Sequence, residues 1–213
     1  MNTKIFALVM VLAGISLLGC ASHEIKALTP QPIDTYELRA TAAGIMIAAE
    51  PFSTKEKVEK AFTIDLTEKG YVPILLVMEN RLGDNVLLTK EEIELVDSQG
   101  NFLKPISAQV MAEKFEKSKM AYALLGFGLF SYMSADEANK KMRSDWSSKE
   151  LPAEKILLPH RKVHGVVYFQ CGLGLAALPN ATLHIPFTNL RTGQRDSIRL
   201  RIAENIPVPE AER

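Results

Sequence analysis

The stretch Val72-Pro73-Ile74-Leu75-Leu76-Val77-Met78-Glu79 decides the fold. It is a continuous apolar run of strand length with β-branched residues, and its proline stands near the start, where a strand tolerates one. The run therefore predicts a central strand that is buried on both faces. The segment Asn80-Arg81-Leu82-Gly83-Asp84-Asn85 follows it, and its composition predicts a turn.

Further short strands are predicted on both sides of this run. Their sequences alternate apolar and polar residues, or are short apolar runs bounded by turn residues. The clearest pair is a hairpin of residues 182–187 and 197–202, joined by a turn at 191–194. The other expected strands lie at about residues 37–39, 44–49, 86–88, 92–97, 155–158 and 163–170.

Two amphipathic helices are predicted within residues 106–151, as a helical insertion between strands. The first carries apolar residues at helical spacing, and the second begins at a capping box and carries a stripe at four-residue steps. A further capping box, Ser53-Thr54-Lys55-Glu56, predicts one short helix through Phe62. The apolar residues that mark the first helix are Val110, Met111 and Phe115. The capping box of the second is Ser134-Ala135-Asp136-Glu137, and its apolar stripe is Ala138, Met142 and Trp146.

The start of the chain has the layout of a secretory signal. Lys4 precedes an apolar run from Ile5 to Leu18, which at 14 residues is too short to span a bilayer comfortably. The ending Leu17-Leu18-Gly19-Cys20 resembles the lipobox of bacterial lipoproteins. The resemblance implies that Cys20 is acylated and that the signal is cut before it, so the chain is attached to the membrane through this lipid anchor. The alternative is an ordinary signal peptide in which the cysteine stands by chance.

The same resemblance implies a location and a division of the chain. Ala21 and Ser22 after the cysteine imply export to the outer membrane, with the domain facing the periplasm, whereas an Asp directly after it commonly signals inner-membrane retention. Pro30 and Pro32 suit a tether. The expected divisions are a signal peptide at 1–19, a mobile lipidated tether at 20–35, one folded domain at 36–206 and a loose tail at 207–213.

About seven short strands with turns between them, in a secreted chain, predict a mainly β fold. The expected architecture is an immunoglobulin-like antiparallel β-sandwich with an inserted helical hairpin at about residues 106–151. One local pattern supports it, because the segment from Ile156 to Phe169 resembles the strand-proline-turn-strand near the end of many bacterial extracellular Ig-like domains. Those domains usually have glycine after the proline, where this chain has His160. They mostly serve binding or assembly, so the resemblance implies no catalytic residue.

Composition and motifs argue against several functional classes. The 25 basic and 25 acidic residues cancel, which gives no indication of a nucleic-acid partner. The sequence holds no Gly-x-Ser-x-Gly elbow, no His-Glu-x-x-His helix and no phosphate loop, so we predict no catalytic residue and no cofactor. His160 and His164 have a spacing known from zinc sites, but no Asp, Glu or Cys stands at ligand-like spacing; we favour two solvent-facing histidines and no metal. Cys171 is expected to be a buried core residue rather than a nucleophile.

Residues 120–135 carry no charge and are the main candidate for an apolar contact. As a helix the segment would be about 24 Å long, short of the roughly 30 Å hydrocarbon core of a bilayer. Three interpretations stay open: a crossover buried against the sandwich, a surface that dips into the membrane beside the anchor, and the wall of a pocket for an apolar ligand. The residues of this candidate contact are Leu124, Phe127, Leu129 and Phe130.

Arg195, Arg199 and Arg201 share one face of the last hairpin. Such a row is a candidate contact for phosphate head groups, lipopolysaccharide or an acidic partner. The favoured interpretation is a solvated sheet face that discourages edge pairing.

Together these features predict a membrane-anchored envelope lipoprotein that acts as a non-catalytic binding or assembly module in the periplasm, with another envelope protein or component as its partner. The alternative is a carrier or sensor of a hydrophobic ligand such as a lipid, using residues 120–135. An enzyme comes third, because no residue pattern identifies a catalytic site.

Overall fold

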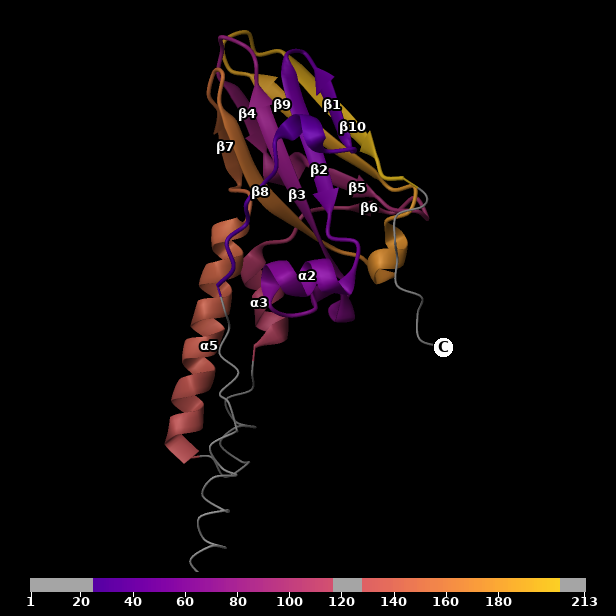
Figure 1. Ribbon diagram of the computed structural model, residues 1–213. Helices are drawn as coiled ribbons and strands as arrows, with labels where there is room; N and C mark the ends of the chain where they lie inside the picture. Colours follow the sequence, from indigo (N-terminus) through magenta and orange to yellow (C-terminus); the bar gives the residue numbers. More distant parts are fainter. Residues whose placement is uncertain (1–24, 117–127, 204–213) are drawn as a thin grey trace, which may run out of the picture.

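The computed structural model describes residues 25–116 and 128–203. Over these residues the chain is mainly β, with two antiparallel sheets, and the helices pack against the outer face of one sheet toward one end of the molecule (Figure 1). Sheet A has the order β1 (Arg39–Ala42), β2 (Ile45–Pro51), β3 (Tyr71–Asn80) and β8 (Lys162–Gln170). Sheet B has the order β6 (Phe102–Leu103), β5 (Glu94–Val96), β9 (Thr182–Asn189), β4 (Val86–Thr89) and β7 (Glu154–Leu157), and β10 (Arg195–Arg201) also pairs with β9. The α-helices are α2 (Lys55–Phe62), α3 (Ala108–Phe115) and α5 (Gly128–Lys149), and the 3₁₀ turns are η1 (Ile33–Thr35), η2 (Leu66–Lys69), η3 (Lys90–Glu92) and η5 (Gly174–Ala177).

β3 is a central strand of sheet A, and its burial on both faces is confirmed. Antiparallel pairing with β2 and with β8 gives it a neighbour on either side. Ile74 and Leu76 face the core between the sheets, and Leu75 and Val77 face the helical layer. None of these four side chains is more than 4% exposed. Burial of each such side chain contributes about 1.5–3 kcal/mol, which is why an uninterrupted apolar run occupies this position.

The core between the two sheets comes from alternating residues, because successive side chains of a strand point to opposite faces. The last hairpin shows this most clearly. Leu183 and Ile185 on β9 are paired with Leu200 and Ile198 on β10, and all four side chains are buried. The hairpin and its inward face are therefore as the sequence predicts.

A second core lies between sheet A and the helices. Trp146 of α5 and Phe62 of α2 are fully buried there with Tyr168 of β8. The rings of Phe62 and Tyr168 meet edge to face, with 5.9 Å between their centroids. Ala138, Met142 and Trp146 are all buried, since their four-residue steps place them on one face of α5.

The inserted helices interrupt the edge of sheet B. β5 and β4 both pair with β9, separated along the chain by η3. β6 pairs with β5 and β7 pairs with β4, and the chain between β6 and β7 contains α3 and α5. The helices thus occupy a break in what is otherwise one edge strand, and they pack on the outer side of sheet A (Figure 1).

The insertion also covers the outer edge of β8. The Ile106 N–H donates to the Tyr168 carbonyl at 2.8 Å, and the Leu151 N–H donates to the Val166 carbonyl at 2.8 Å. A Cβ at Gly165 would lie 2.9 Å from the Leu151 Cα, which is closer than such atoms pack. Glycine at this position therefore lets the segment after α5 approach the strand.

α2 begins one residue later than its capping box predicts. Thr54, and not Ser53, is the cap, because its hydroxyl accepts a hydrogen bond from the Lys57 N–H at 3.2 Å. Serine and threonine are both good caps. Ser53 is packed into the domain, with only 2% of its surface exposed, and Thr54 supplies the cap.

The predicted start of the second inserted helix is wrong. α5 begins at Gly128, so Ser134 lies inside the helix and not at its start. On α3, Met111 is buried as predicted, but Val110 is 50% exposed. Among the described helices, none combines the length and the apolar character needed to cross a membrane.

The packed domain starts before residue 36. Ile33 is fully buried and Tyr36 is 8% exposed, and Leu28 packs partly against the same helical-side core. Residues 28–35 therefore lie on the domain as a strap, and the prediction of a mobile tether over 20–35 is wrong for this part. One buried isoleucine after two prolines has no periodicity from which its packing could be predicted.

Replacing His160 by glycine should stabilise the domain by about 0.5–1 kcal/mol. His160 has φ 56° in the turn between β7 and β8, a left-handed conformation that costs a residue with a Cβ about 1–2 kcal/mol. Glycine avoids this cost but loses about 0.5–1 kcal/mol more backbone entropy on folding. Urea unfolding measures the difference. Arg161→Gly is the control: Arg161 does not have a positive φ, so glycine there should only destabilise.

Candidate functional site

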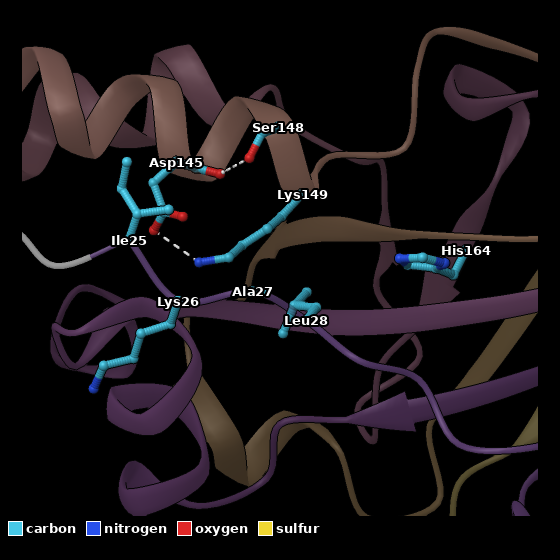
Figure 2. Close-up of a pocket in the computed structure, with 8 residues that line it drawn as sticks. All are labelled: Ile25, Lys26, Ala27, Leu28, Asp145, Ser148, Lys149 and His164. Atoms are coloured by element: carbon cyan, nitrogen blue, oxygen red, sulfur yellow. Dashed lines mark hydrogen bonds and ion pairs between the residues drawn. The ribbon is translucent and has the colours of Figure 1, made fainter.

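A hollow of about 270 Å³ lies between the N-terminal segment and α5 (Figure 2). Residues 25–28 form one wall and the end of α5 forms the other, and His164 of β8 lies at the far side (Figure 2). Pockets for drug-sized ligands span about 300–1,000 Å³, so this hollow has room for a small group only. Its lining residues are Ile25, Lys26, Ala27, Leu28, Asp145, Ser148, Lys149 and His164.

The main polar feature of the hollow is a buried ion pair within α5. Lys149 Nζ donates to Asp145 Oδ2 at 2.7 Å, and the two side chains are 5% and 1% exposed. The same Nζ donates to the Ala61 carbonyl at 2.7 Å and lies 5.2 Å from the centroid of the Phe62 ring. Burial lowers the pKa of Lys149, and the hydrogen bond and charge of Asp145 oppose that shift.

This geometry fastens α5 and does not present a reactive amine. An ammonium has three donors, and Lys149 directs two of them to oxygens held by α5 and α2. A nucleophilic or anion-binding lysine must turn its amine toward the ligand. We therefore interpret the pair as the joint between the end of α5 and the end of α2.

A second ion pair secures α3 at the same place. Lys90 Nζ lies 2.6 Å from Glu150 Oε1, and Glu150 Oε2 accepts a hydrogen bond from the Ala108 N–H at the start of α3. The Tyr168 hydroxyl donates to the Trp146 carbonyl at 3.0 Å, and burial raises the pKa of Tyr168 well above 10.0. Together these bonds fix both inserted helices on sheet A.

The predicted apolar contact falls largely outside the described residues. Leu124 and Phe127 lie outside them, as does Cys20. Leu129 and Phe130 belong to the first turn of α5, at the end that extends away from the sheets (Figure 1). The three interpretations of residues 120–135 stay predictions.

The three arginines of β10 are exposed on the outer face of sheet B. Arg195 Nη2 lies 2.8 Å from Glu92 Oε2, and Arg201 Nη2 donates to Asn180 Oδ1 at 3.1 Å. Arg199 lies between them on the same face. Because an acidic side chain already pairs with one end of the row, this face has mixed charge, as expected of a solvated sheet face.

Both histidines of the predicted pair are exposed. His160 lies in the turn before β8, and His164 lies on the strand. Within residues 25–116 and 128–203, no three His, Cys, Asp or Glu side chains come together as potential metal ligands.

Cys171 is a buried residue of the core between the sheets, as predicted. Its side chain is 1% exposed, and burial raises the pKa of the thiol from 9.0 to about 12, with a smaller contribution from the charge of Asp97. The thiolate is the reactive form of cysteine, so a thiol with this pKa is inert at neutral pH.

The raised pKa of Cys171 should make stability fall in alkaline solution. Between pH 9.0 and about 12 the unfolded chain releases the thiol proton and the folded chain keeps it. Rising pH therefore favours unfolding by about 1.4 kcal/mol per pH unit in this range. Urea unfolding of the wild type and of Cys171→Ala, at neutral pH and at about pH 10, measures the two slopes. If the free energy of unfolding falls equally with pH in the wild type and in Cys171→Ala, the raised pKa of Cys171 is contradicted.

Asn80 organises the loops at the end of the sheets that lies away from the helices (Figure 1). It is fully buried, and its Nδ2 donates to the carbonyls of Asp84 at 2.7 Å and Leu157 at 2.8 Å. Its Oδ1 accepts a hydrogen bond from the Leu82 N–H at 2.9 Å. The sequence predicts only a turn here. The available signal was an asparagine at the first position of a turn-rich segment, where its side chain can bond the backbone two residues on.

Asp84 joins two of these loops. Arg191 Nε and Nη2 donate to its two carboxylate oxygens at 2.6 and 2.8 Å, and Asn189 Nδ2 donates at 3.2 Å. The hydrogen bond from Arg191, followed by that from Asn189, holds the pKa of Asp84 below its usual value. The β3–β4 and β9–β10 connections are thereby held together.

No protein-family model matches the chain, and no curated protein matches it. Several solved structures align with it, among them two that cover most of its length. The yjhA protein from Bacillus subtilis is 13% identical, with 78% of this chain and 97% of that chain covered and a TM-score of 0.39. A functionally unknown protein from Listeria monocytogenes EGD-e is 11% identical, with 78% and 82% covered and a TM-score of 0.37. At these TM-scores the likeness does not establish a shared topology.

Proposed function

We propose that this protein is a lipoprotein of the bacterial outer membrane, anchored through Cys20 and facing the periplasm, whose domain is a non-catalytic binding or assembly module for another envelope component. The anchor rests on the ending Leu17-Leu18-Gly19-Cys20 of the signal-like run. Each buried methylene of an acyl chain contributes about 0.8 kcal/mol, so two or three long chains hold a protein to a membrane almost permanently.

The strand order is the observation that supports an immunoglobulin-like domain, the kind of domain on which the proposed binding role rests. In immunoglobulin domains, strands A, B and E pair in one sheet and strands G, F and C in the other, and variable-type domains add C′ beside C. β2, β3 and β8 occupy the places of A, B and E, whereas β10, β9 and the β4–β5 path occupy those of G, F and C. β7 then takes the place of C′. This order supports an immunoglobulin-like sandwich with the helices inserted within C′.

A sandwich of this kind suits binding because rigid sheets hold loops whose sequences are free to vary. Fold alone does not assign a function, and the partner has to be sought at a particular surface. The carrier alternative gains no support from the described residues. The hollow beside α5 is small, and the Lys149 amine in it is bonded to Asp145 and to the Ala61 carbonyl.

Metabolic labelling with radioactive palmitate tests the anchor. The wild-type chain should carry the label and fractionate with the outer membrane, and Cys20→Ser should lose both the label and the attachment. Cys171→Ala is the matched control, since it removes the other cysteine of the chain and should keep the label. Retention of the label by Cys20→Ser would refute the anchor.

The non-catalytic role and the carrier alternative need separate measurements. Hydrolase activity on ester, phosphate or peptide substrates, abolished by one side-chain change, would contradict a binding module. Native mass spectrometry with solvent extraction tests the carrier: a stoichiometric lipid mass would support it, and a ligand-free mass would count against it.

A further inference from the structure

Three connections form one surface at the end of the sheets that lies away from the helices (Figure 1). We call it the loop platform, and it comprises residues 81–85, 158–162 and 189–194. The buried Asn80 side chain bonds the Asp84 carbonyl and the carbonyl of Leu157, the last residue of β7, and the Asn80 backbone carbonyl accepts a hydrogen bond from the His160 N–H at 2.8 Å. The Leu190 N–H donates to the Asn85 carbonyl at 2.9 Å and joins the third. The platform is therefore preorganised, so binding there would lose little conformational freedom.

The exposed charge of the platform is basic. The platform holds four bases and one acid, Arg81, Arg161, Lys162 and Arg191 against Asp84, and Glu79 at its edge lies 2.9 Å from Arg81. The Arg191 side chain is 72% exposed, but its partner Asp84 is only 20% exposed. Lys162 Nζ lies 3.8 Å from Glu79 Oε1, and the two side chains are 55% and 19% exposed. The bases thus project into solvent while their carboxylate partners are set back, and the surface offered to a partner is positive. Asp34, 3.7 Å from Arg81, is an exposed acid at the margin.

Two large apolar side chains stand among these bases. Leu158 is 51% exposed and Leu190 is 46% exposed. Arginine beside exposed apolar side chains is a composition typical of protein–protein interfaces, whereas a surface that binds only phosphate needs no leucine. This favours a protein partner over a lipid head group.

The lipid anchor would turn the platform away from the membrane, a step that rests on the proposed function. Five residue steps separate Cys20 from Ile25 and span at most about 18 Å. Ile25 lines the hollow beside Asp145 on α5, so the helical end of the molecule is the one held near the bilayer. The loop platform is at the other end (Figure 1).

We propose that the loop platform binds a protein of the envelope through a segment that presents acidic side chains around an apolar contact. Arg161 would meet the carboxylates, and Leu158 and Leu190 would cover the apolar contact.

A photo-crosslinking residue placed in the full chain, in the bacterium that encodes it, tests this binding. Leu190→p-benzoylphenylalanine should give one protein adduct, and mass spectrometry of the crosslinked peptide should find Asp or Glu beside the crosslinked position. Leu173→p-benzoylphenylalanine is the matched control, because Leu173 is 47% exposed and precedes η5 at the helical end. It should not give that adduct.

Charge reversal then tests the recognition. Arg161→Glu should lower the yield of the adduct about tenfold. Arg199→Glu, the same change on the outer face of sheet B, should leave it within about twofold. An adduct of lipid or lipopolysaccharide, no adduct at Leu190, or an adduct unaffected by Arg161→Glu would overturn the proposal. The crosslink is repeated in the Cys20→Ser background to test the platform separately from the anchor. If only the anchor is lost, Arg161→Glu should still lower the adduct yield and Arg199→Glu should not.

Discussion

Replacing Trp146 by alanine should destabilise the domain by about 3–5 kcal/mol, the usual loss for a large aromatic side chain in a core. Trp146 is fully buried between α5 and sheet A. Its indole N–H donates to the Phe62 carbonyl at 3.4 Å, and its ring meets that of Phe115 edge to face with 5.6 Å between centroids. The substitution would remove contacts with α2 and α3 together, so both helices should loosen.

Urea unfolding followed by circular dichroism measures this loss, since the variant lacks the one tryptophan of the chain. Ser144→Ala on the exposed side of α5 is the control and should change stability by less than about 0.5 kcal/mol. A loss of under about 1 kcal/mol for Trp146→Ala would mean that the helical layer contributes little to the fold.

Replacing Lys149 by methionine should cost about 3–5 kcal/mol, because it leaves the Asp145 carboxylate buried without its ammonium. Asp145 is 1% exposed, so water cannot take over the lost interaction. The Ala61 carbonyl loses its donor as well. The stem of methionine fills much of the same space, so the change tests charge more than volume.

The double variant Asp145→Leu, Lys149→Met should recover most of that loss, since an apolar pair of similar volume is often as stable as a buried ion pair. Lys140→Met is the matched control: Lys140 also forms a pair at four-residue spacing, at 2.8 Å from Asp136, but is 76% exposed. Its loss should stay below about 0.5 kcal/mol. If the double variant is no more stable than Lys149→Met, the two groups are not coupled as we describe.

The strands with strong local signals were predictable from the sequence. β3 is an unbroken apolar run, and β9 and β10 alternate apolar and polar residues across a polar turn. In each case the apolar pattern along the sequence matches the side chains that are buried. The apolar stripe of Ala138, Met142 and Trp146 on α5 was also predictable, because apolar residues at helical spacing mark the buried face of a helix. β6, only two residues long, has no such signal and was not predicted.

The boundaries and the strap depended on tertiary packing. Gly128 is a poor helix former, yet α5 begins there. Ile33 is buried by residues distant in the chain, and nothing local distinguishes it from a linker residue. The ion pair of Asp145 and Lys149 shows the same limit, because four-residue spacing predicts a pair but not that the pair is buried.

The loops show why a candidate surface is harder to derive than a core. Arg191 lies in the predicted turn at 191–194, but its bond to Asp84 joins residues 107 positions apart. The sequence shows that Asn80 starts a turn and does not show that it bonds the Leu157 carbonyl at the end of β7. Such polar contacts depend on how the two sheets pack, and only the folded chain specifies that.

Ile106 and Leu151 occupy the outer hydrogen-bonding edge of β8, and this affects how neighbouring molecules behave toward each other. An open strand edge with apolar residues such as Val166 and Phe169 is a template for the addition of further chains. Copies of a protein at high local concentration would meet such edges often. The inserted helices thus also guard against fibre formation, and a chain shortened by removing them should polymerise through β8.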